Sequence, residues 1–284
     1  MAQIAFWSNA HGQPGNTSNA AVIAALTGLE YDIRTLVTQT QFERSTLETL
    51  FTKSNELQLG GLRDISDIGL DALARLARAN KLMPESVKNK SITLERNRLD
   101  LLVGTMKPYE GLYESLSEHV KPIFDIANNY YQSVIVDLHS GSKNPLTTAL
   151  LNESDLVVVS LCQNRTLLDR FFSKEDWPAA LYNKPVVLLI GQYDPYSKYT
   201  ASNIQRLYKR SWDFKQPIYT IPYCSDFKDA MNDKDLMGWL RKNKNLSKKH
   251  PNHFFFQELR KAAKAILEEI GVNTQVKYIE RGVS

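Results

Sequence analysis

The sequence predicts a single α/β domain with a twisted, mainly parallel sheet covered by helices on both faces. Short apolar runs rich in β-branched residues recur along the chain, helical stretches separate them, and the runs do not alternate apolar with polar residues. A strand that is apolar throughout needs cover on both of its faces. Because no low-complexity tract, repeat or Pro/Gly/Ser linker interrupts the sequence, residues 1–284 are expected to form one domain.

The expected elements follow from hydrophobic periodicity. We expect strands at residues 4–7, 34–37, 91–94, 99–103, 134–137, 156–161, 186–190 and 218–222. We expect helices at residues 16–29, 68–79, 116–131, 200–213, 233–243 and 253–270. Residues 91–94 and 99–103 are interpreted as a hairpin or two edge strands. The apolar side of the last helix is expected to dock on the core, with a helix lying on a membrane surface as the alternative.

Composition is typical of a soluble globular protein, with 43% apolar and 23% charged residues among 284. A net charge of +4 is too small to indicate a nucleic-acid partner by itself. Cys162 and Cys224 lie far apart, which favours neither a disulfide framework nor a zinc module. We expect a cytoplasmic protein without integral membrane association, because no apolar run approaches the roughly 18–20 residues of a span and the first residues lack a signal peptide's basic region.

The turn that leaves the first strand and enters the first helix is the most informative segment. It reads Trp-Ser-Asn-Ala-His-Gly-Gln-Pro-Gly-Asn-Thr-Ser over residues 7–18. A helix N-terminus presents unpaired N–H groups and the positive end of the helix dipole, which favour an anion. Gly12 and Gly15 can adopt the positive φ that a phosphate cradle requires, and a Thr at the helix start can offer its hydroxyl to magnesium.

This turn resembles the loop of the deviant Walker P-loop ATPases of the ParA/MinD family, which reads Lys-Gly-Gly-x-Gly-Lys-Thr-Thr. His11 falls on the family's signature lysine and Asn16 on the P-loop lysine, so both lysines are replaced. The resemblance implies a three-layer P-loop NTPase domain of the SIMIBI or MinD-like class that binds ATP or ADP. The residues that it assigns to nucleotide binding are His11, Gly12, Gln13, Pro14, Gly15, Asn16, Thr17, Ser18 and Pro222.

The resemblance continues beyond the loop. Residues 130–141 resemble the family's Walker B strand, so Asp137 and Thr17 are the residues expected to bind Mg²⁺. Residues 154–159 resemble the next strand, and Pro222 lies in an Ile-Pro segment similar to the one beside the adenine. Residues 38–41 read Thr-Gln-Thr-Gln where active members carry Asp-x-Asp. The degenerate loop, with residues 203–206 and 227–230, is most similar to the TadZ/CpaE branch, which positions Flp pilus machinery at cell poles.

The missing lysines predict weakened binding and very slow or absent hydrolysis. A hydrogen bond to a charged group contributes about 1.5–3 kcal/mol, so losing the P-loop lysine lowers nucleotide affinity roughly 10- to 150-fold. The leading interpretation is a nucleotide-binding organiser of pilus or secretion machinery. One alternative is an active ParA-type partitioning ATPase, in which Lys143 or a residue of a partner subunit replaces the lost charge. Another is a nucleotide-free interaction scaffold.

The resemblance also implies partners. A homodimer is expected, with pilus or secretion assembly proteins as partners and peripheral recruitment to the pole or membrane through them. If His11 reaches across the dimer as the signature lysine does, dimerisation depends on pH, although a histidine that only lines the turn is the favoured interpretation. The basic run at residues 241–250 could bind DNA, as basic surfaces of ParA relatives do, although a solvated loop is the favoured interpretation. A metal hydrolase built on Asp137 and His139 is disfavoured because no second ligand pair has suitable spacing.

Overall fold

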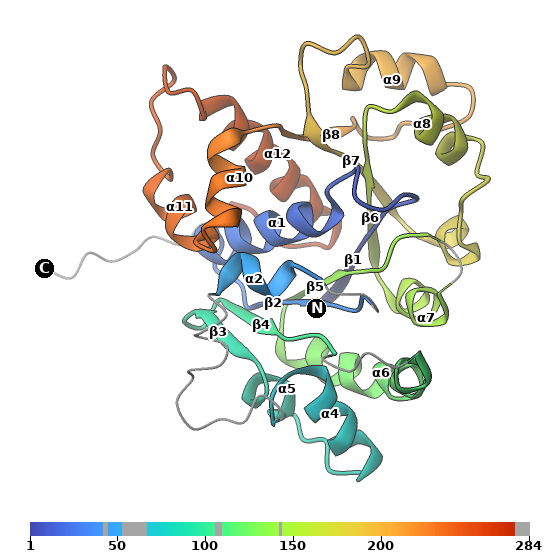
Figure 1. The fold of residues 1–284 in the computed structure, drawn as a ribbon, viewed down its shortest axis with the longest axis vertical. Helices are drawn as coiled ribbons and strands as arrows, with labels where there is room; N and C mark the ends of the chain where they lie inside the picture. Colours follow the sequence, from blue (N-terminus) through green and yellow to red (C-terminus); the bar gives the residue numbers. More distant parts are fainter. Residues whose placement is uncertain (42–44, 53–66, 106–109, 142–143, 276–284) are drawn as a thin grey trace, which may run out of the picture.

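An eight-stranded sheet runs through the computed structural model, which describes residues 1–41, 45–52, 67–105, 110–141 and 144–275. The strand order is β3-β4-β2-β5-β1-β6-β7-β8 (Figure 1). Every neighbouring pair is parallel except β3 and β4, which are antiparallel. The predicted α/β class and mainly parallel sheet are therefore confirmed.

The strands and helices have the following bounds, given in chain order. The strands are β1 (Ala2–Trp7), β2 (Thr35–Gln39), β3 (Ile92–Glu95), β4 (Leu99–Leu102), β5 (Ser133–Asp137), β6 (Leu156–Leu161), β7 (Val186–Tyr193) and β8 (Tyr219–Pro222). The helices are α1 (Asn16–Glu30), α2 (Leu47–Phe51), α4 (Gly69–Arg78), α5 (Ser86–Asn89), α6 (Glu110–Tyr130), α7 (Pro145–Glu153), α8 (Arg165–Phe172), α9 (Ala201–Tyr208), α10 (Ser225–Asn232), α11 (Leu236–Lys242) and α12 (His253–Glu269), with a 3₁₀ helix at Ala179–Asn183.

Helices cover both faces of the sheet, because alternate residues of the central strands point to opposite sides. In β1, Ala5 and Trp7 pack into one core with α4 to α9, whereas Ile4 and Phe6 pack into the other with α1, α2, α10, α11 and α12. All four of these β1 residues are completely buried. The apolar side of α12 is buried in the second core, as expected for a helix docked on the sheet.

Several short helices were not predicted. α7, α8 and α10 have 9, 8 and 8 residues, so two turns of amphipathic pattern give little periodic signal. Their start signals are nevertheless present: the side chains of Asn144 and Asn164 accept backbone N–H bonds at the first turns of α7 and α8. The helix expected at residues 200–213 ends early, at Tyr208.

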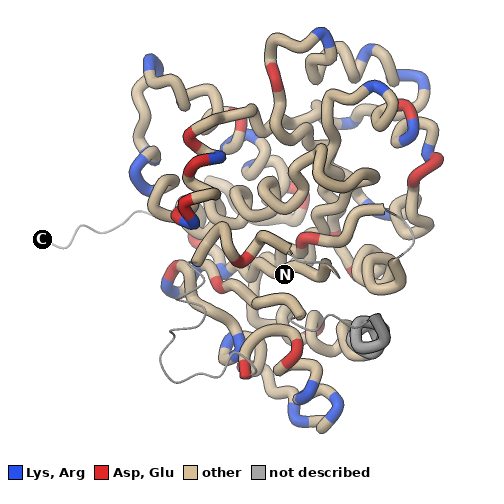
Figure 2. The backbone as a smooth tube through the Cα atoms, in the orientation of Figure 1, with Lys and Arg blue, Asp and Glu red and all other residues tan. Residues whose placement is uncertain are grey.

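Charged residues lie mostly on the outer helices and their connecting loops, with both signs interspersed (Figure 2). Within the described part of the chain, no helix combines the length and apolar character needed to cross a bilayer. The basic run predicted at residues 241–250 lies at the end of α11 and in the segment before α12. One of its members, Arg241, forms an ion pair with Glu95 of β3.

Candidate functional site

The turn between β1 and α1 has the backbone shape of an anion cradle. Gly12 and Gly15 have φ values of 75° and 65°, in the left-handed region that glycine adopts without strain. A Cβ at Gly15 would lie 2.9 Å from Ser18 Oγ, so the first turn of α1 passes close to the loop. The N-terminal N–H groups of α1 are thereby presented beside the loop.

A cavity of about 540 Å³ opens over this turn. Its lining residues are His11, Gly12, Gly15, Asn16, Thr17, Ser18, Gln41, Thr46, Thr49, Leu50, Ser140, Gln192, Met231, Asn232 and Lys234. Six of the nine residues that the sequence assigns to the nucleotide are therefore brought together on its wall. The other walls come from α2, from the end of α10 and from Gln192 of β7.

Gln13 and Pro14 make contacts away from the cavity. Gln13 Oε1 accepts a hydrogen bond from Asn164 Nδ2 at 3.1 Å, and the carbonyl of Pro14 accepts one from Asn19 Nδ2 at 3.1 Å. A Cβ at Gly191 of β7 would lie 2.1 Å from the Pro14 carbonyl oxygen, so only glycine allows this approach. Pro222, the last residue of β8, is not among the lining residues.

Asn16, which the sequence resemblance aligns with the P-loop lysine, directs its amide into the protein. Its Nδ2 donates to the carbonyl oxygen of Phe6 at 2.9 Å and to Asp137 Oδ1 at 2.8 Å. Both amide hydrogens are thus used on protein acceptors, and the residue is only 8% exposed. Asn16 therefore has no amide hydrogen to offer a phosphate in this arrangement.

Asp137 ends β5 at the point where β1 and β2 flank it, and it is completely buried. Thr17 Oγ1 donates to its Oδ2 at 2.7 Å, and Gln41 Nε2 donates to the same oxygen at 2.7 Å. Burial raises the pKa of Asp137 to about 7, while the hydrogen bonds from Thr17, Gln41 and Asn16 oppose that rise and the charge of Glu48 adds to it. No ion pair to Asp137 occurs among the described residues.

The expected magnesium ligands meet, but their oxygens are occupied. Gln41 Nε2 lies 3.0 Å from Thr17 Oγ1 and 2.7 Å from Asp137 Oδ2, and Thr17 donates directly to Asp137. Mg²⁺ needs oxygen ligands at short range with room for water, and an amide N–H₂ group offers only donors. While Gln41 keeps this position, the pair does not fit a divalent cation. Among the described residues, no cluster of three or more His, Cys, Asp or Glu is placed to hold a metal.

The end of β2 carries amides where active ParA/MinD members carry carboxylates. Gln39 Nε2 donates to Glu48 Oε1 at 3.0 Å, and the backbone N–H of Gly104 donates to the same oxygen at 2.9 Å. Glu48, on α2, is a buried carboxylate that sequence reasoning missed. Its Oε1 is held by these two donors, and it is not among the residues that line the cavity.

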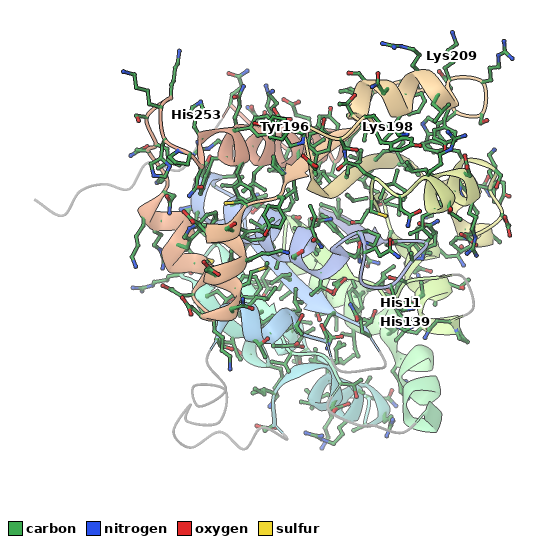
Figure 3. All side chains as sticks on the ribbon, turned by 45° about the horizontal axis from the view of Figure 1, so that its top comes forward. His11, His139, Tyr196, Lys198, Lys209 and His253 are labelled. Carbon is green, nitrogen blue, oxygen red and sulfur yellow. The ribbon has the colours of Figure 1, made fainter. Side chains whose placement is uncertain are left out.

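Two further groups of basic side chains lie at the cavity. His11, which lines the cavity, lies with its ring edge to face against that of His139, with ring centroids 4.6 Å apart. Figure 3 labels both residues. Lys234, just after α10, also lines the cavity. Lys143, the cation considered from sequence, lies outside the described residues. Lys234 was missed because the sequence places it in the helix expected at residues 233–243, whereas in the structure it lies between α10 and α11.

Comparison with known proteins identifies the fold. No family model and no curated protein sequence matches the chain. A ParA family ATPase from Chlorobium tepidum TLS superposes with a TM-score of 0.67 at 17% identity, covering 93% of this chain and 98% of that one. The cell division ATPase MinD of Pyrococcus furiosus gives 0.62 at 13%, covering 94% and 98%. MinD of Pyrococcus horikoshii OT3, complexed with Mg-ADP, gives 0.63 at 12%, covering 94% and 96%. The fold is that of the ParA and MinD ATPases.

The ParA/MinD fold predicted from the sequence is thus confirmed, and it extends over nearly the whole chain. At these identities the similarity establishes the fold and does not distinguish one branch from another. The resemblance to the TadZ/CpaE branch stays a prediction, as do the assigned nucleotide and metal ligands.

Proposed function

We propose that this chain binds ATP or ADP in the cavity at the β1–α1 turn, hydrolyses it very slowly or not at all, and acts as a homodimeric organiser of pilus or secretion assembly proteins. The ParA/MinD fold supports nucleotide binding, because a solved MinD with the same fold holds Mg-ADP. The cavity, the two positive-φ glycines and the start of α1 support it independently of that similarity.

The single observation that carries the proposal is the orientation of Asn16. Its amide hydrogens go to Phe6 and Asp137, and no Lys or Arg precedes residue 34 in the sequence. The β1–α1 turn therefore contributes backbone donors and the helix dipole to phosphate binding, but no fixed cation. A cation at the transferring phosphoryl group typically contributes 10³–10⁵ in rate, so hydrolysis loses more than binding does.

Titration with mant-ATP and mant-ADP beside a phosphate-release assay tests the proposal. Gly12→Ala and Gly271→Ala form a matched pair, because both glycines have φ of 75° and neither has an atom within 4 Å of an added Cβ. Only Gly12 lines the cavity. We expect binding by the wild type and by Gly271→Ala, and about tenfold weaker binding by Gly12→Ala. Absence of binding by the wild type would favour the nucleotide-free scaffold.

One observation favours an active ATPase as a second candidate, namely the presence of Lys234 on the cavity wall. A lysine there supplies the positive charge that the loop lacks. Lys234→Met is compared with Lys228→Met, since Lys228 lies on α10 over the ring of Tyr223 and does not line the cavity. Turnover comparable to that of ParA-type ATPases, lost only in Lys234→Met, establishes the second candidate and refutes the first.

The dimer and the remaining partners are tested separately. Analytical ultracentrifugation with ATP between about pH 5.5 and 8 tests the homodimer and the role of His11 in it, and a profile without pH dependence excludes that role. DNA is a less favoured partner because Arg241 is already paired with Glu95. Sequence-independent DNA binding would weaken steeply with added salt. Pilus or secretion partners are tested by co-purification with pilus and secretion assembly proteins of the same organism.

A further inference from the structure

Gln41 lies between Thr17 and Asp137, the two residues expected from the sequence to bind Mg²⁺. Its Nε2 lies 3.0 Å from Thr17 Oγ1 and 2.7 Å from Asp137 Oδ2. Thr17 already gives its hydroxyl hydrogen to Asp137, so the lone pairs of Oγ1 face Gln41. The Asp137 carboxylate, and the Thr17 hydroxyl that already donates its hydrogen, can both accept a hydrogen bond only from a donor group. The amide nitrogen, and not the amide oxygen, therefore satisfies this position.

The backbone around Gln41 holds the amide in place. The N–H of Gln41 donates to Gln39 Oε1 at 2.7 Å, and the N–H of Thr40 donates to the carbonyl oxygen of Asp137 at 3.1 Å. Gln39 is itself fixed by its bond to Glu48. The chain leaving β2 is thus tied to β5 directly beside the buried carboxylate, and the Gln41 side chain follows from that anchoring.

We propose that the Gln41 amide replaces the divalent cation at the Thr17–Asp137 pair, so that this chain binds nucleotide without magnesium. The inference rests on the proposed nucleotide site and deepens it by defining the ligand as the metal-free nucleotide. The two hydrogens of Nε2 reach both oxygens while adding no net charge. A metal ion would have to displace Gln41 and break both of its hydrogen bonds before reaching the same oxygens.

The test measures mant-ADP affinity with excess Mg²⁺ and with EDTA at matched ionic strength. The variants are Gln41→Ala, which removes the amide, and Gln192→Ala, which removes a second glutamine from another wall of the same cavity and leaves Thr17 and Asp137 unchanged. We expect Mg²⁺ to change wild-type and Gln192→Ala affinity by less than about twofold, and to tighten binding by Gln41→Ala about tenfold. Equal magnesium dependence in all three proteins, or weaker magnesium binding in Gln41→Ala, overturns the proposal. The latter result would mean that the amide rotates to present its oxygen to the metal.

A measurement without nucleotide separates this inference from the proposed function. In Gln41→Glu a second carboxylate faces Asp137, so a divalent cation should bind between them and raise the melting temperature. We expect Mn²⁺ alone to stabilise Gln41→Glu, to give a bound electron paramagnetic resonance signal with it, and to do neither with the wild type. If neither the wild type nor any variant binds mant-ADP, the proposed function fails, and the Mn²⁺ result still decides the role of Gln41. Equal Mn²⁺ binding by the wild type and Gln41→Glu overturns that role.

Discussion

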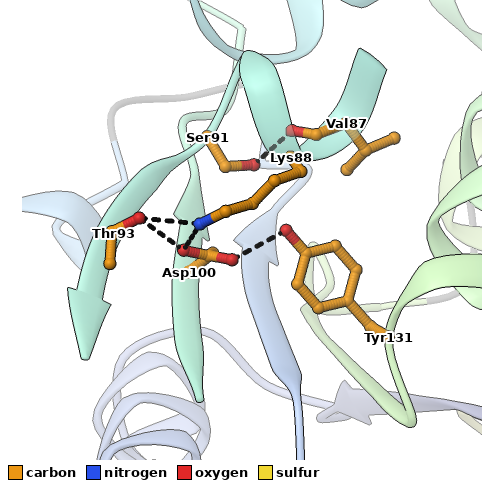
Figure 4. Close-up of polar contacts among 6 residues, drawn as sticks. All are labelled: Val87, Lys88, Ser91, Thr93, Asp100 and Tyr131. Carbon is orange, nitrogen blue, oxygen red and sulfur yellow. Dashed lines mark hydrogen bonds and ion pairs between the residues drawn. The ribbon is translucent and has the colours of Figure 1, made fainter. Parts of the chain in front are cut away.

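Two buried aspartates on neighbouring parts of the sheet are stabilised in different ways. Asp100 of β4 contacts Lys88 Nζ at 2.6 Å, Tyr131 Oη at 2.9 Å and Thr93 Oγ1 at 2.8 Å (Figure 4). Asp137 of β5 is surrounded by the neutral donors of Asn16, Thr17 and Gln41. Among the described residues, Asp100 therefore has a cation within hydrogen-bond distance, and Asp137 has only neutral donors.

The difference between these two regions distinguishes a structural group from a candidate site. The cluster around Asp100 contains its own counterion and belongs to the packing of α5 and α6 against the sheet. Asp137 lies beneath a cavity, next to a helix N-terminus, at the strand ends where α/β folds bind their ligands. Of the two carboxylates, the one that has no ion pair within the described part of the chain is thus the one that adjoins the candidate site.

The largest expected effect comes from removing the counterion of Asp100. Lys88→Met leaves a carboxylate that is 6% exposed without its cation, so we expect the free energy of unfolding to fall by about 3 kcal/mol. Lys90→Met is the control, because Lys90 pairs with the exposed Asp67, and it should cost about 0.5 kcal/mol. Urea unfolding measures both. Equal losses would mean that Asp100 does not depend on a cation and would remove the contrast with Asp137.

A smaller loss is expected for Asp137→Asn. The amide offers one oxygen to three donors and turns its own N–H₂ toward one of them, so a buried donor loses its acceptor at a cost of about 2 kcal/mol. Asp155→Asn is the control, because Asp155 Oδ2 accepts a hydrogen bond from the backbone N–H of Gln3 but the residue is exposed. We expect this variant to lose less than about 0.5 kcal/mol of unfolding free energy. A gain in unfolding free energy for Asp137→Asn would show instead that the uncompensated carboxylate is destabilising.

The sequence predicted the fold, and it predicted which strand ends meet at the candidate site, because both depend on patterns local to the chain. The apolar runs of β1, β5 and β6 are unambiguous, and the carboxyl ends of adjacent parallel strands must meet, which brings Asp137 to the β1–α1 turn. The glycine pattern predicted the cradle for the same reason: a tight turn before a helix requires positive φ.

The direction of a polar side chain and the contribution of distant segments could not be predicted. Nothing in the sequence distinguishes an Asn16 that faces a phosphate from one that donates to Phe6 and Asp137. Gln41 appeared only as a departure from the ParA/MinD pattern, although its position just past β2, beside β5, was a usable signal. Lys234 was expected inside a helix at residues 233–243, but α10 ends at Asn232 and α11 begins at Leu236, so the lysine lies in the connection between them.

Placing a lysine at position 16 should make the environments of the two aspartates more alike. Asn16→Lys places a cation between Asp137 and the cavity, so we expect mant-ADP to bind about tenfold more tightly, equivalent to about 1.4 kcal/mol. Thr49→Lys is the control, because it adds the same charge on α2 at another wall of the cavity, and it should tighten binding about twofold. Fluorescence titration compares them. Equal gains in mant-ADP affinity would indicate that any added positive charge attracts the nucleotide and that position 16 has no specific role.

The smallest effect separates the hydroxyl groups that serve the two carboxylates. Thr17→Val removes a donor from Asp137 and an acceptor from Gln41 Nε2, so we expect a loss of about 1 kcal/mol. Thr93→Val removes a donor from Asp100, but Thr93 is exposed and Lys88 remains to compensate the charge, so the loss should be about 0.3 kcal/mol. Parallel urea titrations without nucleotide measure the difference. Equal losses of unfolding free energy in Thr93→Val and Thr17→Val would contradict this explanation. They would mean that Lys88 does not compensate for the lost hydroxyl at Asp100.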